Sequence, residues 1–209
     1  MERQDQNAVK HSSKRRYILI AAVAAVLAIA LSITLYKCRH YVLPKRFAEV
    51  VPGQLYRSGQ MKAGPMRRVL DQHNIRTIVN MMHATEDEPW QELERQMAAE
   101  RGIEIIRIPM NSNGLTLSGS FDDVEKAAAI LQGEPVDGKV YPHPVLLHCA
   151  AGACRTGSSY AVWRMKYCGW DADRAIAEAR SHGKIDPRMV PWLQQYYQER
   201  IVSTRPATK

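Results

Sequence analysis

The sequence predicts an α/β fold, in which a central, mostly parallel sheet is flanked by helices and preceded by one N-terminal transmembrane helix. Two observations support this fold class. Short apolar segments alternate with segments of helical spacing, as expected for parallel strands that are joined by helices. In addition, residues 17–36 form an apolar run without a charged residue, which as a helix is long enough to cross a bilayer.

The apolar run YILIAAVAAVLAIALSITLY separates a basic N-terminal tail (1–16) from a folded domain (45–202). Lys and Arg residues flank the run on both sides, and tyrosines lie at its two ends, where an interfacial aromatic belt is expected. The alternative is a cleaved signal peptide with Ala28-Ile29-Ala30 at the cleavage site. We favour a retained single-pass membrane anchor, because the apolar run continues past that site. The basic residues are too evenly divided to predict which side of the membrane the domain faces.

The elements of the domain follow from hydrophobic periodicity and from turn residues. Four aromatic residues at helical spacing are predicted to belong to the core: Trp163, Trp192, Tyr196 and Tyr197. In chain order we expect a turn and short strand in VVPGQLYRSG, a helix at 66–73, a strand at 75–82, a helix at 90–101, a strand at 103–110, a helix ending at Leu131, a strand at 145–148 and a helix from Arg155.

The composition of the chain indicates which classes of molecule it is expected to bind. The net charge of +8 over 209 residues suits an anionic substrate or a membrane surface. The sequence has no combined aromatic and basic motif of the nucleic-acid-binding type, so we expect no nucleic-acid partner. The four cysteines do not suggest a structural disulfide framework, and no Cys/His spacing resembles a metal site.

The segment HCAAGACRTG (148–157) carries the candidate chemistry. It lies between a predicted buried strand and a predicted helix, and its centre is built of small residues. Such a loop leaves its backbone N–H groups free to converge on a phosphate dianion at the N-terminus of the helix. The predicted substrate-binding residues are therefore Ala150, Ala151, Gly152, Ala153, Cys154 and Arg155.

Four side chains of this segment have predicted catalytic roles. Cys149 is expected to be a nucleophilic thiolate, because converging N–H groups and a helix N-terminus lower the pKa of a thiol. Arg155 offers a planar fork that can bind two phosphoryl oxygens. The Thr156 hydroxyl is expected to stabilise the sulfur as a leaving group, and His148 to orient the loop from behind through hydrogen bonds.

His148, Cys149, Arg155, Thr156 and Gly157 match the H-C-x5-R-[S/T]-G signature of the cysteine-dependent protein tyrosine phosphatases. Together with the LYRSGQ segment near the start of the domain, the chain resembles the dual-specificity branch and its atypical relatives over roughly residues 48 to 200. This resemblance implies a protein tyrosine phosphatase-like fold and a mechanism without metal or cofactor. It also implies that the thiolate forms a phosphocysteine, which water then hydrolyses.

The resemblance also implies a general acid, which is an aspartate in the family. Placing the chain on the dual-specificity pattern through Leu117-Ser118 and Phe121 puts Asn111 at that position. Asn cannot donate a proton in this way, and no Asp or Glu lies between Met110 and Phe121. The carboxylate we choose instead is Asp87, in the loop after IVNMM, with Glu86 and Glu88 beside it.

The missing aspartate can be accounted for in three further ways. Asp122 or Asp123 could serve, although both fall in a first helical turn, where acidic residues favour the helix dipole. The substrate could have a leaving group of low pKa, such as a phosphoanhydride, that needs no acid. Alternatively, catalysis is weak, and the domain is a phosphate-binding module tethered to the membrane.

Two features of the sequence bear on the class of substrate. Relatives that act on phosphoinositides or inositol pyrophosphates often carry Lys or Arg inside the signature loop, whereas this chain has Ala150, Ala151 and Ala153. This favours proteins that carry phosphotyrosine, phosphoserine or phosphothreonine. The membrane anchor favours the alternative, a phosphoinositide or inositol phosphate.

Cys154 lies directly before the arginine, as a second cysteine does in the low-molecular-weight tyrosine phosphatases. That resemblance implies a reversible Cys149–Cys154 disulfide, which would protect the nucleophile from irreversible oxidation. Alternatively, Cys154 is a small residue that only packs against its neighbours. A further alternative is that the whole domain is a redox sensor that uses the Cys149–Cys154 pair.

Overall fold

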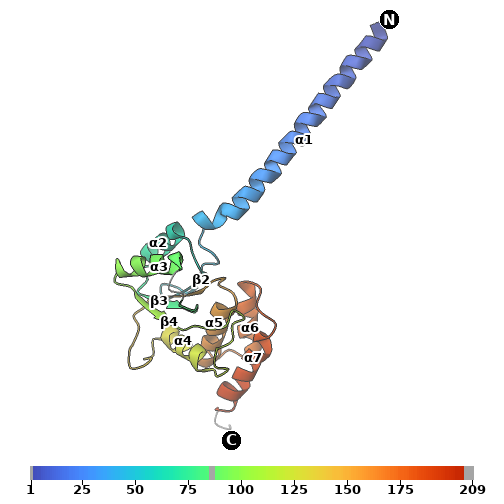
Figure 1. Cartoon of the computed structure of the whole chain (residues 1–209). Helices are drawn as coiled ribbons and strands as arrows, with labels where there is room; N and C mark the ends of the chain where they lie inside the picture. The colour runs from blue at the N-terminus through green and yellow to red at the C-terminus, as the bar shows by residue number, and fades with distance from the viewer. Residues whose placement is uncertain (1, 85–87, 205–209) are drawn as a thin grey trace. The chain divides into compact units, whose positions relative to one another are not determined.

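The computed structural model describes residues 2–84 and 88–204, in two compact units, 1–42 and 43–209. The first unit is one helix, α1 (Glu2–Val42), shown in blue in Figure 1. Its segment Ile20–Val42 has a mean hydropathy of 2.1 and is long and apolar enough to cross a membrane. No Gly or Pro lies between residues 2 and 42, so the predicted boundaries at 16 and 36 are not marked by a break in the helix.

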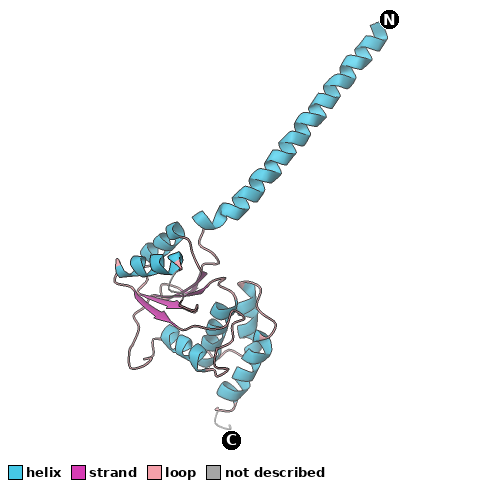
Figure 2. Ribbon diagram, in the orientation of Figure 1, coloured by secondary structure: helices cyan, strands magenta, loops and turns pink. Residues whose placement is uncertain are grey.

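The second unit is an α/β domain, in which strands (magenta) lie among helices (cyan) in Figure 2. Its sheet of five strands has the order β1-β2-β5-β3-β4. Strand β1 is antiparallel to β2, and all the other pairs are parallel. The predicted fold class is confirmed. The elements are β1 (Ala48–Val51), β2 (Leu55–Gly59), α2 (Ala63–Gln72), β3 (Thr77–Asn80), α3 (Pro89–Ala99), β4 (Glu104–Arg107), α4 (Asp122–Gln132), β5 (Val145–Cys149), α5 (Cys154–Tyr167), α6 (Ala172–Ser181), α7 (Met189–Tyr196) and a π-helical turn (Tyr197–Val202).

Helices cover both faces of the sheet (Figure 1). The central strand β5 shows how its side chains divide between the two layers. Leu146 belongs to the apolar cluster beneath α2 and α3, whereas Val145, Leu147 and Cys149 belong to the cluster shared with α4 to α7. This is the alternation of a strand that is buried on both faces. It places His148 and Cys149 on opposite faces.

Two predicted strands are shorter than expected at their C-terminal ends. The segments 75–82 and 103–110 leave the regular ladder after Asn80 and Arg107. The chain still hydrogen-bonds across the sheet there, from the Met81 N–H to the His148 carbonyl (3.0 Å) and from the Met110 N–H to the Met81 carbonyl (3.3 Å). Residues 81 and 110 therefore form an irregular edge next to the signature loop.

The predicted aromatic core is confirmed. Trp163, Trp192 and Tyr196 are buried, and Tyr197 is half-buried against the same cluster. Phe121 packs edge-on against Tyr196, with ring centroids 5.1 Å apart. These contacts join α4, α5 and α7 into the layer on which the signature loop rests.

Candidate active site

The signature loop connects the central strand to the central helix. β5 ends at Cys149 and α5 begins at Cys154, so the loop lies at the carboxyl edge of a parallel sheet and at a helix N-terminus, as predicted. The Cys149 side chain is buried, and its Sγ accepts a hydrogen bond of 3.2 Å from the Gly152 N–H. At least one loop amide therefore points at the sulfur.

Two glycines allow the loop to fold this tightly. Gly152 has φ +72°, and a Cβ at this position would lie 2.5 Å from the backbone nitrogen of Gly59. Gly59 ends β2 opposite Cys149, and a Cβ there would lie 2.8 Å from the Ala151 carbonyl oxygen. The two backbones touch, so the RSG end of the LYRSGQ segment is a structural requirement of the loop.

We expect Gly152→Ala to lower the free energy of unfolding by about 2 kcal/mol, because it combines backbone strain at positive φ with a steric clash. Gly138→Ala is the matched control: Gly138 has φ +80°, but its Cβ would meet no atom within 4 Å. Thermal unfolding of the full chain in detergent measures both. Equal losses in the two variants would show that the close approach to Gly59 contributes nothing.

The electrostatics of the loop favour a thiolate. Burial by itself would raise the pKa of Cys149. The side chain and N–H of Thr156, the charge of Arg155 and the Gly152 N–H outweigh burial, so that the pKa of Cys149 lies below the ordinary value of a thiol. The sulfur is thus prepared for nucleophilic attack at a lower pH than an ordinary cysteine.

Two buried groups beside the sulfur lack partners among the residues that the structure describes. One is Nε of Arg155, whose Nη1 donates to the Met81 carbonyl at 3.4 Å. The other is the hydroxyl of Thr156, which has no hydrogen bond of normal geometry but still lowers the pKa of Cys149. Buried donors without a partner are rare in folded proteins. Both residues also lower the pKa of Cys149, so Arg155 and Thr156 act at the sulfur.

Arg57 supports the loop from the neighbouring strand, a role that the sequence alone does not predict. This residue of β2 is 1% exposed, and its Nη2 donates to the Gly152 carbonyl at 3.1 Å. Its guanidinium carbon also lies 5.5 Å from the ring centroid of Tyr160, in a cation–π contact. A buried cation therefore lies directly behind the loop.

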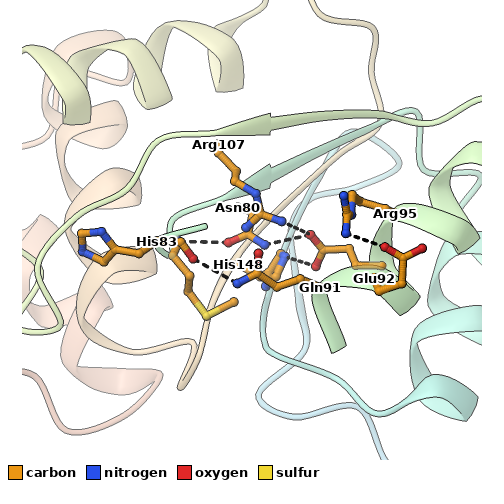
Figure 3. Close-up of polar contacts among 9 residues, drawn as sticks. Asn80, His83, Gln91, Glu92, Arg95, Arg107 and His148 are labelled. Carbon is orange, nitrogen blue, oxygen red and sulfur yellow. Dashed lines mark hydrogen bonds and ion pairs between the residues drawn. The ribbon is translucent and has the colours of Figure 1, made fainter. Parts of the chain in front are cut away.

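A buried polar network holds His148 on the other face of the sheet. Asn80, Arg107 and His148 converge on one point (Figure 3), the carboxylate of Glu94 in α3. Nε2 of His148 lies 2.9 Å from Oε2 of Glu94, and Nδ2 of Asn80 donates to Oε1 at 2.8 Å. His148 thus contacts the loop through the backbone and the core through its side chain, consistent with the predicted orienting role.

Burial opposes the charge of Glu94, but His148, Asn80 and Arg107 outweigh it and lower the pKa of this carboxyl below the ordinary value of a glutamate. Its folded-state pKa is therefore lower than its unfolded-state pKa, so its contribution to stability is present above the unfolded-state value and is lost as the pH falls through the folded-state value. We expect Glu94→Gln to cost about 3 kcal/mol near neutral pH and to flatten this acid-side loss.

Urea unfolding over a series of pH values tests the Glu94 prediction. The control is Glu92→Gln in the same helix, which removes an exposed ion pair with Arg95 and should cost no more than about 0.5 kcal/mol. A Glu94→Gln chain that is as stable as the Glu92→Gln chain at neutral pH would contradict the role assigned to the buried network.

The loop expected to carry a general acid packs over the start of α5. A Cβ on Gly114 would lie 2.9 Å from the Cys154 carbonyl, so the backbone of this loop touches the signature loop. Asn111 is part of this loop, and its Nδ2 donates to the Thr116 carbonyl at 2.9 Å. The Asn111 side chain thus stabilises the turn of its own loop. That Asn111 stands at the position of the family's general acid stays a prediction.

The structure describes some of the carboxylates that were considered as the general acid. Asp87, our choice, and Glu86 lie outside the described residues. Glu88 is exposed and accepts a hydrogen bond of 2.9 Å from Trp90 Nε1. Asp122 is in the first turn of α4, with Arg200 3.9 Å away, as expected for a residue that stabilises the helix terminus.

Cys154 and Cys149 are both free thiols in this structure. Cys154 is half-buried, and its Sγ faces the Lys184 carbonyl at 3.9 Å. The reversible disulfide between the two cysteines stays a prediction.

One known family matches most of the folded domain. The family described as "DSP-PTPase phosphatase fused to NAD+ Kinase" matches residues 48–189, which include β1, the complete signature loop and the start of α7. The chain belongs to this family of dual-specificity-type phosphatases. The matched region of this chain holds Cys149, Arg155 and the buried network around Glu94. No curated protein matches the chain.

Several solved structures share the fold of this domain. The core catalytic domain of the PP-IP phosphatase SIW14 from S. cerevisiae is 20% identical with a TM-score of 0.58, and the match covers 77% of this chain and 90% of that one. TpbA from P. aeruginosa is 21% identical with a TM-score of 0.55, covering 76% and 87%. PTPMT1 in complex with PI(5)P is 16% identical with a TM-score of 0.54, covering 76% and 99%. At these identities the likeness supports the fold alone.

Proposed function

We propose that this chain is a membrane-anchored, metal-independent phosphatase, which hydrolyses phosphate monoesters through a phosphocysteine intermediate. The observation that carries this proposal is the buried Cys149, whose pKa is lowered by the same loop groups that would bind a phosphate. The anchor is α1, whose segment Ile20–Val42 can cross a bilayer. The catalytic domain of this proposal is the folded domain predicted for residues 45–202.

In the proposed mechanism Arg155 and the loop amides bind the phosphoryl oxygens. The Cys149 thiolate attacks phosphorus, the bond to the ester oxygen breaks, and that oxygen takes a proton from a general acid or from water. Water then attacks the phosphocysteine, and inorganic phosphate and the thiolate are released. Thr156 stabilises the departing sulfur, and His148, paired with Glu94, holds the end of β5 in place.

The proposed substrates are phosphorylated proteins, because the loop itself carries Ala150, Ala151 and Ala153 in place of extra cations. A second candidate is a phosphoinositide or inositol phosphate. It is favoured by the membrane-spanning potential of α1 and by two proteins of the same fold, which are named as a PP-IP phosphatase and as a complex with PI(5)P.

The function is tested with the full chain in detergent micelles, under reducing conditions with a chelator. We expect turnover of para-nitrophenyl phosphate and, after rapid acid quenching, a phosphorylated Cys149 peptide in the mass spectrum. Phosphotyrosine and phosphothreonine peptides, phosphatidylinositol phosphate vesicles and inositol pyrophosphate then rank the substrate classes. Binding of tungstate without turnover of any of these compounds would overturn the enzyme proposal and favour the tethered phosphate-binding module.

The Asp87→Asn variant tests whether Asp87 is the general acid. If Asp87 protonates the leaving oxygen, the variant should lose about a hundredfold in kcat on a phosphotyrosine peptide. It should lose much less on para-nitrophenyl phosphate, whose leaving group is more acidic. The matched control is Glu88→Gln, next in sequence, whose side chain bonds to Trp90 instead. Equal rates for Asp87→Asn and the parent on the peptide would exclude Asp87.

A further inference from the structure

Three cations contact three successive carbonyls of the signature loop. Lys45 Nζ donates to the Ala150 carbonyl at 2.9 Å and Arg46 Nη1 to the Ala151 carbonyl at 2.7 Å. Arg57 Nη2 donates to the Gly152 carbonyl at 3.1 Å. We call Lys45, Arg46 and Arg57 the carbonyl clamp. Local sequence patterns predict none of the three, because they are distant in sequence from the loop they contact.

The clamp determines where the loop amides point. A trans peptide directs its C=O and the following N–H in opposite directions. With the Ala151 carbonyl held outward by Arg46, the next N–H, that of Gly152, points inward, and it donates to Cys149 Sγ. By the same geometry the outward carbonyls of Ala150 and Gly152 turn the N–H groups of Ala151 and Ala153 inward.

The backbone of the clamp is itself constrained. Arg46 has φ 45°, a left-handed conformation that non-glycine residues rarely adopt. Its side chain is held between the loop and Gly183, at which a Cβ would lie 3.0 Å from Arg46 Nε and 3.3 Å from the Ala153 Cβ. The Lys45 carbonyl also accepts from the Gly59 N–H at 2.7 Å. Backbone strain that the surroundings maintain in this way is typical of functional positions.

We propose that Lys45 and Arg46 are positioning residues of the phosphatase site, which with Arg57 hold the carbonyls of residues 150–152 outward and thereby aim the loop amides at the substrate phosphate. The inference rests on the proposed function and extends it to residues before position 48, where the family match begins. It also makes the segment that directly follows α1 a part of the active site.

The charges that act on Cys149 come from several elements. Arg155 acts from α5, Arg57 from β2 and Lys45 from the segment before β1, and Thr156 adds its hydroxyl and N–H. Burial and repulsion from Arg46 lower the pKa of Lys45, and the neighbouring Cys149 opposes that shift. The His148–Glu94 pair lies on the other face of the sheet.

The test uses the full chain in detergent, with variants Lys45→Met, Arg46→Gln and the double variant. The first readout is tungstate affinity; the second is the pH dependence of iodoacetamide modification of Cys149, read by peptide mass spectrometry. We expect about fivefold weaker tungstate binding for each single variant, a larger loss for the double variant, and a shift of the modification midpoint to higher pH.

Two further variants distinguish the loss of loop positioning from a general loss of positive charge and from disruption of the fold. Arg67→Gln removes one exposed positive charge from α2 and should leave both readouts unchanged. Arg46→Lys keeps a charged donor for the Ala151 carbonyl and should regain most of the affinity. Clamp variants that behave like Arg67→Gln would overturn the inference. Neither readout requires turnover, so a chain that hydrolyses no phosphate ester would refute the proposed function without obscuring this result.

Discussion

Cys149→Ser is expected to abolish turnover, with a loss of about a thousandfold or more in kcat on any phosphate ester. A serine hydroxyl at this position stays protonated at neutral pH, because its pKa lies far above that of a thiol in the same loop. The structure places the replaced sulfur in a buried position where it accepts from Gly152. The variant therefore removes the nucleophile and leaves the groups that bind phosphate in place.

This expectation is checked by assaying para-nitrophenyl phosphate hydrolysis and tungstate binding with the same preparations. Cys149→Ser should still bind tungstate, because Arg155 and the loop amides are intact. Cys168→Ser, which changes an exposed thiol just after α5, serves as the control and should retain full activity. Parent-like turnover by Cys149→Ser would contradict the phosphocysteine mechanism.

Arg155→Lys should lower kcat by roughly a hundredfold to a thousandfold, although it preserves the charge. The Arg155 guanidinium contacts the Met81 carbonyl through Nη1 and keeps Nε buried without a partner in the part of the chain that the structure describes. One planar group can thus be held by the protein and still offer two donors to the phosphoryl group as charge develops in the transition state. A lysine ammonium cannot do both.

Steady-state kinetics with a phosphotyrosine peptide measure this effect. Arg188→Lys is the control, because Arg188 is an exposed arginine whose fork binds Asp186. If Arg155→Lys changed KM alone and left kcat at the parent value, the arginine would bind the substrate without stabilising the transition state.

Much of the fold and the centre of the site could be predicted from local patterns. The strand that leads into Cys149 and the helix that follows it are both encoded by consecutive residues, so periodicity and turn chemistry suffice to predict them. Helix α6 has no counterpart among the predicted elements, although Asp171 carries a readable signal: its side chain accepts from the Arg174 N–H at 2.8 Å and caps the helix.

The supporting residues could not be predicted in the same way. Glu94 reaches His148, and Lys45 reaches Ala150, only through the tertiary fold. Nothing in the sequence around either residue distinguishes it from a solvated surface charge. Arg57 is the exception, since it lies inside the LYRSGQ segment, but the segment by itself does not reveal that its arginine is buried under the loop.

Side chains along β5 alternate between the two faces of the sheet, so the function of the site depends on the exact number of residues in this strand. Strand register pairs Gly59 with Cys149 on one side and Asn80 with His148 on the other. A single-residue insertion or deletion between 145 and 148 would turn every later side chain to the opposite layer. The thiol would then face Glu94 and the imidazole would face Arg155. The central strand of this domain therefore cannot gain or lose one residue between 145 and 148 without exchanging the partners of the thiol and the imidazole.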